Sequence, residues 1–181
     1  MTDEEALRLE MAALVPRLRR FALGLTRAAD QADDLVQATC ERAIRGLDGF
    51  TRGTRLDSWM YRIMQNLHRN ALRDHAVRAR HATQVGLQGE PSLDGAGAAQ
   101  VRADLQTVGA ALDRLDPEQR MALILIGVEG FSYQEAAEIM EVPVGTVTSR
   151  LARARLRLRA ALEDDGTGGG PGAGPADGKE E

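Results

Sequence analysis

Apolar residues recur every three or four positions through most of the chain, which is the spacing that predicts amphipathic helices. The first such stripe, within residues 4–28, consists of Leu7, Met11, Leu14, Leu18, Phe21 and Leu25. Pro16 interrupts it, and because proline cannot donate a backbone hydrogen bond, we expect a kink or a new helix start there. The beginning of the chain is therefore expected to be helical with one buried face.

Two more helices are expected before residue 82. Asp30 can cap a helix running to about Leu47, with a buried face made of Val36, Cys40, Ile44 and Leu47. The glycine-containing loop 49–55 precedes a helix over roughly residues 57–80. One side of that helix carries Met60, Ile63, Leu67 and Ala71, and another carries Trp59, Arg62, Asn66, Arg69 and Arg73.

Residues 82–99 lose this periodicity and contain several Gly, Pro and Ser residues. This composition predicts a flexible linker, and hence a boundary between two helical domains, residues 1–81 and 100–163. The final segment, 164–181, is rich in Gly, Pro and acidic residues, so we expect it to be disordered. The predicted fold class is all-α, with two small helical domains joined by a flexible linker.

The second domain contains the pattern of a helix-turn-helix. After a helix over about 100–115, Asp116 is expected to cap the next helix, with Pro117 at its first position and Gln119 three residues after the cap. Gly130 is expected to end it. Ser132 and Glu135 form an S-x-x-E capping box before a short helix ending near Met140, and a three-residue turn leads into a long helix.

Positive charge is concentrated on that last helix although the whole chain has a formal net charge of −4. Between residues 144 and 162 there are five arginines and no acid. Val147, Leu151, Ala154 and Leu158 are expected to face inward, whereas Thr146, Ser149, Arg150, Arg153 and Arg157 face outward. Such a face suits a recognition helix in the DNA major groove. A solvated amphipathic helix is the alternative, but the turn, the capping box and the absence of acids favour DNA.

Other functional classes find little support in the sequence. The single cysteine, Cys40, excludes an intrachain disulfide and a cysteine-based zinc site, and it is interpreted as a small core residue. There is no glycine-rich phosphate loop, metal-ligand cluster or nucleophile–base pair, so we expect a non-enzymatic protein without cofactor or metal. His68, His75 and His81 are expected to be solvated or close to phosphate. No apolar run approaches membrane-spanning length and the N-terminus is acidic, so a cytoplasmic protein without membrane insertion is expected.

Two pairs of motifs resemble bacterial RNA polymerase sigma factors. "DQADDLVQATCERAIRGLDGF" and "LDSWMYRIMQNLHRNALRD" resemble region two, whereas "LDPEQRMALILIGVEGFSYQEAAEIM" and "VPVGTVTSRLARARLRL" resemble region four. Their order, the short linker and the absence of regions one and three resemble the extracytoplasmic-function (ECF) group over about residues 5–162. The resemblance implies a sigma factor that binds core polymerase, recognises the −35 and −10 promoter elements and promotes DNA opening.

The resemblance also implies roles for particular residues. Asp33, Asp34 and Gln37 fall where the family docks on the clamp helices of the polymerase β′ subunit, although alone they would indicate only a solvated surface. The loop 50–56 and Asn66 fall where the family receives a flipped base of the −10 element, since an amide can both donate to and accept from a base edge. The β flap of polymerase and promoter DNA are further implied partners, and the family also commonly has an anti-sigma factor.

The remaining expected DNA contacts divide between the two promoter elements. Trp59 could stack on melted DNA or pack in the core, and Arg62, Arg69 and Arg73 are expected to contact phosphates of the −10 region. The −35 region is expected to contact Thr146, Thr148, Ser149, Arg150, Arg153 and Arg157. Many relatives carry Lys or Arg in place of Thr148, so one base or phosphate contact is expected to be missing there.

The main alternative is a stand-alone helix-turn-helix regulator that binds duplex operator DNA without polymerase, with residues 1–80 as a sensing or dimerisation domain. Trp59 and Asn66 beside a glycine loop argue against it, because such a face suits single strands. A pure interaction protein, such as an anti-regulator, would leave the arginine helix without a purpose. The acidic tail is interpreted as a disordered appendage rather than as a competitor of DNA for the arginine helix.

Overall fold

The computed structural model describes residues 3–81, 109–112 and 114–166, and all regular structure among these residues is helical. The helical elements include α1 (Asp3–Thr26), α2 (Ala29–Arg45), η1 (Leu47–Gly49), α3 (Leu56–His81), α5 (Pro117–Gly127), α6 (Tyr133–Met140) and α7 (Val144–Gly166). The all-α fold class is therefore confirmed. The expected linker, 82–99, lies outside the described residues, as does the expected tail from residue 167 onward.

Helix α1 is continuous through Pro16, so the new helix start expected at that residue does not occur. Apolar side chains on both sides of the proline are buried, including Met11, Leu18 and Phe21. Their packing keeps the helix continuous even though the proline removes a backbone hydrogen bond. The apolar stripe predicted from the sequence is thus the buried face of α1.

Helix α2 differs from its prediction in its cap and in its buried face. Ala28 stands at the N-cap, not Asp30, which lies in the first turn, where a negative charge still favours the helix dipole. Ile44 is 50% exposed, because the face turned toward α1 and α3 is centred on Ala32, Val36 and Ala43. Thr39 is fully buried on this face. Its hydroxyl donates to the Leu35 carbonyl at 2.7 Å, so the buried polar group has a hydrogen-bond partner.

The helix-turn-helix of α6 and α7 is formed as predicted. The Glu135 amide donates to Ser132 Oγ at 3.2 Å, and the Ser132 amide donates to Glu135 Oε2 at 2.8 Å, which completes the capping box. Glu141 ends α6 in the left-handed conformation, with φ of 55°. Inside the crossing, Val147 and Leu151 of α7 are buried.

Three details of the second half differ from expectation. The carboxylate of Asp116, the N-cap residue of α5, makes no capping bond, because it accepts a hydrogen bond from Arg157 instead. Helix α5 ends at Gly127, before Gly130, which lies in the following turn with φ of 76°. Helix α7 continues to Gly166, beyond the end expected near Leu162.

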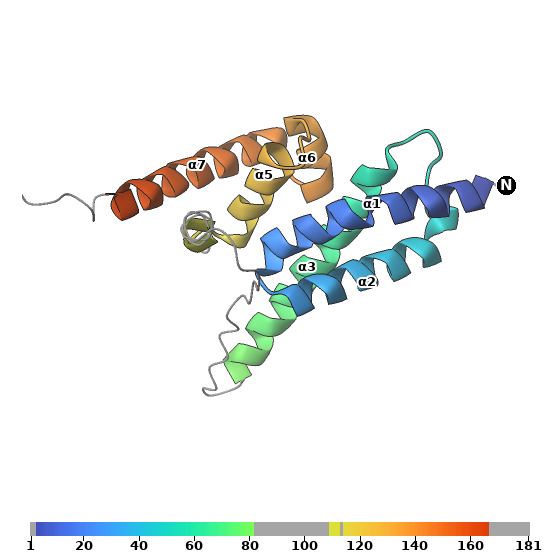
Figure 1. The fold of residues 1–181 in the computed structure, drawn as a ribbon, viewed down its shortest axis with the longest axis horizontal. Helices are drawn as coiled ribbons and strands as arrows, with labels where there is room; N and C mark the ends of the chain where they lie inside the picture. Colours follow the sequence, from blue (N-terminus) through green and yellow to red (C-terminus); the bar gives the residue numbers. More distant parts are fainter. Residues whose placement is uncertain (1–2, 82–108, 113, 167–181) are drawn as a thin grey trace, which may run out of the picture.

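The helices form two groups that pack against each other (Figure 1): α1 to α3 make the first helical group, and α5 to α7 the second. Helix α1 contacts α5, and α3 contacts α6, whereas α7 and the C-terminal end of α3 project away from the contact. Tyr61 lies between Phe21 and Phe131, with ring centroids 4.9 and 5.0 Å apart and edge-to-face geometry. Helices α1 and α5 also approach each other closely, since a Cβ atom on Gly24 would lie 2.6 Å from Ile124 Cδ1.

Candidate nucleic-acid interface

Asn66 and Arg69 lie one turn apart on α3 and contact each other directly. The Arg69 guanidinium donates to Asn66 Oδ1, and the same terminal nitrogen pairs with Glu141 Oε2 at 3.0 Å. Arg73, one turn further along, is exposed. The structure thus brings together an amide that can address a base edge and guanidinium groups that can bind phosphate.

A stripe of polar side chains on α3 extends this face along the helix. Ser58 Oγ, Arg62 Nε, Gln65 Oε1 and Arg69 Nε are all buried and have no hydrogen-bond partner among the described residues. Their spacing of four, three and four residues places them on one side of α3. Ser58 and Gln65 were not among the residues predicted from the sequence, although this regular polar spacing along the helix could have revealed them.

Trp59 is half-buried and packs on the first helical group. Its ring lies 5.2 Å from that of Phe50, and a Cβ atom on Gly46 would lie 3.8 Å from its Cζ2 atom. Two roles were expected for Trp59, and the structure shows the packing role. Stacking of Trp59 on melted DNA stays a prediction.

The loop between η1 and α3 is anchored at both of its ends and paired with charged neighbours. Phe50 and Leu56 are buried, and Arg52 forms an ion pair with Asp3. A cavity of about 350 Å³ lies between this loop and the start of α1. Arg55 pairs with Asp57 at 2.7 Å, and its guanidinium lies 5.2 Å from the centroid of the Phe131 ring.

Asp57 and Tyr61 have pKa values shifted by these surroundings. Partial burial raises the pKa of Asp57, but hydrogen bonds from Arg55 and the Ser58 amide, together with the charges of Arg55 and Arg17, outweigh it, so the pKa is lowered overall. Burial and the hydrogen bond to Glu129 raise the pKa of Tyr61. At neutral pH the carboxylate of Asp57 is therefore charged and the Tyr61 hydroxyl remains a donor.

The three residues expected to bind polymerase lie on the exposed face of α2. Asp33 accepts a hydrogen bond from Arg19 at 2.6 Å, and this bond lowers the pKa of the Asp33 carboxyl. Gln37 donates to Glu41 at 3.1 Å. Asp34 is exposed and makes no ion pair within the described part of the chain. The face is thus accessible, and its use by polymerase stays a prediction.

On α7 the expected recognition residues separate into two sets. Arg150 is mostly buried and pairs with Glu118, while Arg157 donates to Asp116 at 2.9 Å and to Gln119 at 3.1 Å, so both arginines lie against the start of α5. Arg153 is exposed and makes no ion pair within the described ranges. It shares a helix face with Thr146 and Ser149.

Thr148 stands apart from both sets on α7. It is exposed, and its hydroxyl donates to the Val144 carbonyl at 3.0 Å. Helical periodicity places it on nearly the opposite side from Thr146, so it does not join the Arg153 face.

His68 of α3 is buried, which corrects the expectation that it is solvated or close to phosphate. Its exposed fraction is 8%, and burial, followed by the charge of Arg120, lowers its pKa. The helix periodicity of Met60, Met64 and His68 explains this position, because all three share a buried side. His75, two turns away, is exposed.

The buried His68 predicts that acidification lowers stability. The unfolded chain takes up a proton near pH 6.5, whereas the folded chain resists it, so the free energy of unfolding falls as pH drops below about 6.5. The slope contributed by one site is at most about 1.4 kcal/mol per pH unit. Between pH 7.5 and 5.5, the free energy of unfolding of His68→Gln, measured with urea, should depend less on pH than that of the unmodified protein. The exposed control His75→Gln should retain it, and equal slopes in the two variants would contradict the assignment.

Neither a metal site nor a membrane helix is found within the described ranges. These residues contain no group of three or more His, Cys, Asp or Glu side chains that could hold a metal ion. None of the helices described is both long and apolar enough to span a membrane.

Comparison with known proteins assigns both helical groups to one class. Residues 11–78 match the family "Sigma-70 region 2", and residues 105–158 match "Sigma-70, region 4". The ECF RNA polymerase sigma factor EcfG of Rhodopseudomonas palustris is 41% identical over 90% of this chain and 88% of its own length. The ECF sigma factor SigC of Mycobacterium tuberculosis is 37% identical over 74% of this chain and 71% of its own.

Solved structures show the same arrangement of helices. The sigma factor RpoE of Bartonella quintana, crystallised with the anti-sigma factor NepR, is 34% identical, with a TM-score of 0.73 over 89% of this chain and 99% of its own. CnrH, solved with the cytosolic domain of CnrY, is 25% identical, with a TM-score of 0.66 over 90% of this chain and 91% of its own.

The fold and these matches define a sigma-70-type transcription initiation factor with regions two and four. More particularly, the chain belongs to the extracytoplasmic-function group of RNA polymerase sigma factors. Sigma factors of this kind direct core RNA polymerase to promoter DNA and are not enzymes. The stand-alone regulator is therefore not favoured.

Proposed function

We propose that this sigma factor divides promoter recognition between its two helical groups. Asn66 of α3 receives an unpaired base of the −10 element, while Arg62, Arg69 and Arg73 hold the phosphates of the melted strand. Trp59 borders this site. The observation that carries the proposal is the direct contact between Asn66 and Arg69 on one face of α3. An amide beside a guanidinium can bind a base edge and its adjoining phosphate together.

The second helical group binds the −35 element through α7. Arg153, Thr146 and Ser149 face the major groove, since they share one side of the helix and Arg153 is exposed there. Arg150 and Arg157 lie beside the start of α5 and contact phosphates at the edge of the groove. Thr148 lies off this face, so it supplies little to recognition although it was expected among the −35 contacts.

The two groups correspond to domains 1–81 and 100–166, with 82–99 as a linker that passes through the polymerase and 167–181 as a tail. Asp33, Asp34 and Gln37 dock on the β′ clamp helices, and the second domain meets the β flap. The protein carries no catalytic group of its own and acts in the cytoplasm. An anti-sigma factor of the class bound by the related RpoE is a further partner, because that relative aligns over most of this chain.

Run-off transcription with purified core polymerase tests this proposal. Core polymerase plus this protein should initiate at promoters that transcript mapping identifies after overexpression, whereas core polymerase alone should not. If the reconstituted enzyme starts at no promoter while the protein alone protects a palindromic duplex from nuclease, the stand-alone regulator is the correct function instead.

Substitution of Arg153 is expected to weaken −35 binding. Arg153→Ala should cost about 1–3 kcal/mol if the guanidinium reads a base, and the loss should depend on the −35 sequence. Footprinting of the holoenzyme on promoters with altered −35 elements measures it. Arg155→Ala is the matched control, because Arg155 is also exposed but lies on another side of α7. Equal footprints for both variants would remove Arg153 from the interface.

A further inference from the structure

Arg55 stands immediately before α3, at the end of the loop that leads into this helix. Its carbonyl accepts a hydrogen bond from the Trp59 amide at 3.2 Å, which is the bonding pattern of an α-helix, so the backbone of Arg55 already follows the helical path. Arg62 and Arg69 follow at intervals of seven residues, which is close to two full turns. Arg55 therefore lies on the same side of α3 as two of the arginines proposed to hold the melted strand.

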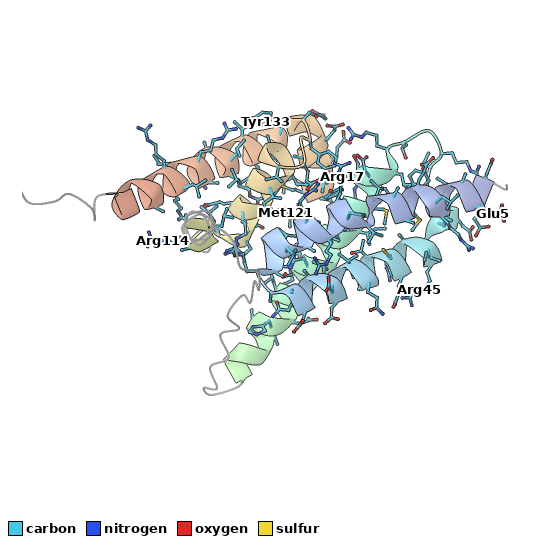
Figure 2. All side chains as sticks on the ribbon, in the orientation of Figure 1. Glu5, Arg17, Arg45, Arg114, Met121 and Tyr133 are labelled. Atoms are coloured by element: carbon cyan, nitrogen blue, oxygen red, sulfur yellow. The ribbon has the colours of Figure 1, made fainter. Side chains whose placement is uncertain are left out.

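Asp57 holds the Arg55 guanidinium through two hydrogen bonds. Arg55 Nε donates to Asp57 Oδ1 at 3.0 Å, and Arg55 Nη2 donates to Asp57 Oδ2 at 2.7 Å. Such a bidentate pair fixes the plane of a guanidinium as well as its position. The Asp57 side chain is 15% exposed, and Arg17, labelled on α1 in Figure 2, lies 3.8 Å from the same carboxylate. The carboxylate is thus bound from both α1 and the start of α3.

The remaining terminal nitrogen of Arg55 binds an anionic group in this structure. Arg55 Nη1 donates to the Glu135 carboxylate of α6, and the Arg55 side chain is 54% exposed. A carboxylate and a phosphate make the same kind of charge-assisted hydrogen bond with a guanidinium, so this nitrogen is also suited to a phosphate. Glu135 belongs to the second helical group, whereas Asp57 belongs to the first. Asp57 therefore stays bound to Arg55 when a phosphate replaces Glu135.

The charges around Arg55 favour a phosphate in spite of Asp57. Within the first helical group, the guanidinium groups of Arg17 and Arg55 share the single Asp57 carboxylate. This cluster keeps a net positive charge, since two cations are paired with one anion. A phosphate that approaches Arg55 Nη1 is therefore attracted by the cluster as a whole.

We propose that Arg55 is a further phosphate contact for the melted strand of the −10 element, and that Asp57 is its positioning residue. Arg55 lies eleven residues before Asn66, or about 16 Å along the helix at 1.5 Å per residue, on the side of the loop 50–56. It extends the proposed strand-binding face beyond the start of α3. This inference rests on the proposed role of α3 in binding the −10 strand.

The alternative role for Arg55 is to fasten the two helical groups together. Its guanidinium pairs with Glu135 and lies 5.2 Å from the centroid of the Phe131 ring, and both partners belong to the second group. If Arg55 served only this contact, its removal would loosen α6 and leave DNA binding unchanged or stronger. If Arg55 binds a phosphate, its removal weakens DNA binding. The sign of the effect therefore decides between the two roles.

Binding of the holoenzyme to fork DNA at several salt concentrations tests Arg55. The labelled DNA carries a duplex −35 element and a single-stranded non-template −10 element from a promoter that transcript mapping identifies. Arg55→Ala should weaken binding several-fold and should reduce the slope of log affinity against log salt by about 0.7, the contribution of one phosphate contact to a single strand. An unchanged slope would overturn the phosphate contact.

Arg8→Ala is the charge-matched control for this measurement. Arg8 is exposed on α1, where it pairs with Glu4 one turn earlier, and it belongs to no proposed DNA-binding surface. The variant should change neither the affinity nor the slope. An equal loss of slope in Arg8→Ala and Arg55→Ala would show that net charge alone governs binding, and the proposal would fall.

Neutral methylphosphonate linkages identify the phosphate that Arg55 contacts. Each linkage of the −10 strand is replaced in turn, and one of them should weaken binding of the unmodified holoenzyme several-fold but have no effect on Arg55→Ala. If every linkage that weakens the unmodified holoenzyme weakens Arg55→Ala to the same extent, Arg55 contacts no phosphate and the proposal is wrong.

Asp57→Asn tests the positioning role, because charge and orientation predict opposite signs. Loss of a negative charge alone strengthens DNA binding, whereas release of Arg55 from its bidentate partner weakens it. We expect several-fold weaker binding when Arg55 is present and no weakening in the Arg55→Ala background. Stronger or unchanged binding by Asp57→Asn alone would overturn the positioning role. Circular dichroism melting of each variant verifies folding.

The same measurements separate this inference from the proposed function. If the unmodified holoenzyme binds the fork DNA and Arg55→Ala binds it equally well, the role of Arg55 is wrong and the sigma function stands. If the unmodified holoenzyme binds the fork DNA no better than core polymerase alone, the proposed function itself fails.

Discussion

Asn66→Ala is expected to lose most promoter opening while assembly with core polymerase survives. If the amide binds a flipped base through paired hydrogen bonds, its removal costs about 1–3 kcal/mol, which corresponds to roughly a five- to 150-fold fall in open complexes. Permanganate reactivity of −10 thymines measures the opening, and native gel electrophoresis with core polymerase measures the assembly. Loss of opening with unchanged assembly is the result expected for a residue that contacts DNA.

Two further variants make this result specific. Asn70→Ala removes a second amide, which is exposed and lies one turn further along the same side of the helix, so normal opening in this variant would show that recognition depends on the position of Asn66. Asn66→Asp keeps an oxygen that can accept from Arg69 but lacks the amide donor. Loss of opening in the Asp variant would assign the effect to base recognition, whereas normal opening would show that Asn66 acts only by positioning Arg69. Full opening by the Ala variant would remove Asn66 from the site.

Local features of the fold could be predicted from the sequence because they depend on neighbours along the chain. The stripe of α1 and the capping box of Ser132 and Glu135 each rest on residues three or four positions apart. The same reasoning was wrong at Ile44 and did not find Thr39 in the core. Hydrophobicity alone does not reveal that the Thr39 hydroxyl is satisfied by a carbonyl one turn earlier.

The candidate site could be predicted only in part. Asn66, Arg69 and Arg153 lie on the faces expected from helical periodicity, but the partners of the arginines could not be foreseen. Arg69 meets Glu141, which is 72 residues away in sequence, and Arg157 meets Asp116, which is 41 residues away. Such pairs arise from how helices pack against one another, so the spacing of residues along a single helix does not predict them.

Phe21→Ala is expected to cause the largest loss of stability. Phe21 is fully buried, and its ring packs edge-to-face on Tyr61 at 4.9 Å. Truncation of a buried phenylalanine removes apolar burial and leaves a cavity, so the free energy of unfolding should fall by about 3–5 kcal/mol. Urea unfolding followed by circular dichroism measures it. Leu9→Ala, at a position 62% exposed on the same helix, should change stability by less than about 0.5 kcal/mol.

The position of Tyr61 gives this variant a second consequence. Tyr61 contacts Phe21 within the first helical group, and Phe131 and Glu129 of the second, so a cavity at Phe21 weakens the support of the contact between the groups. A loss below about 1 kcal/mol would show that the site collapses to fill the space.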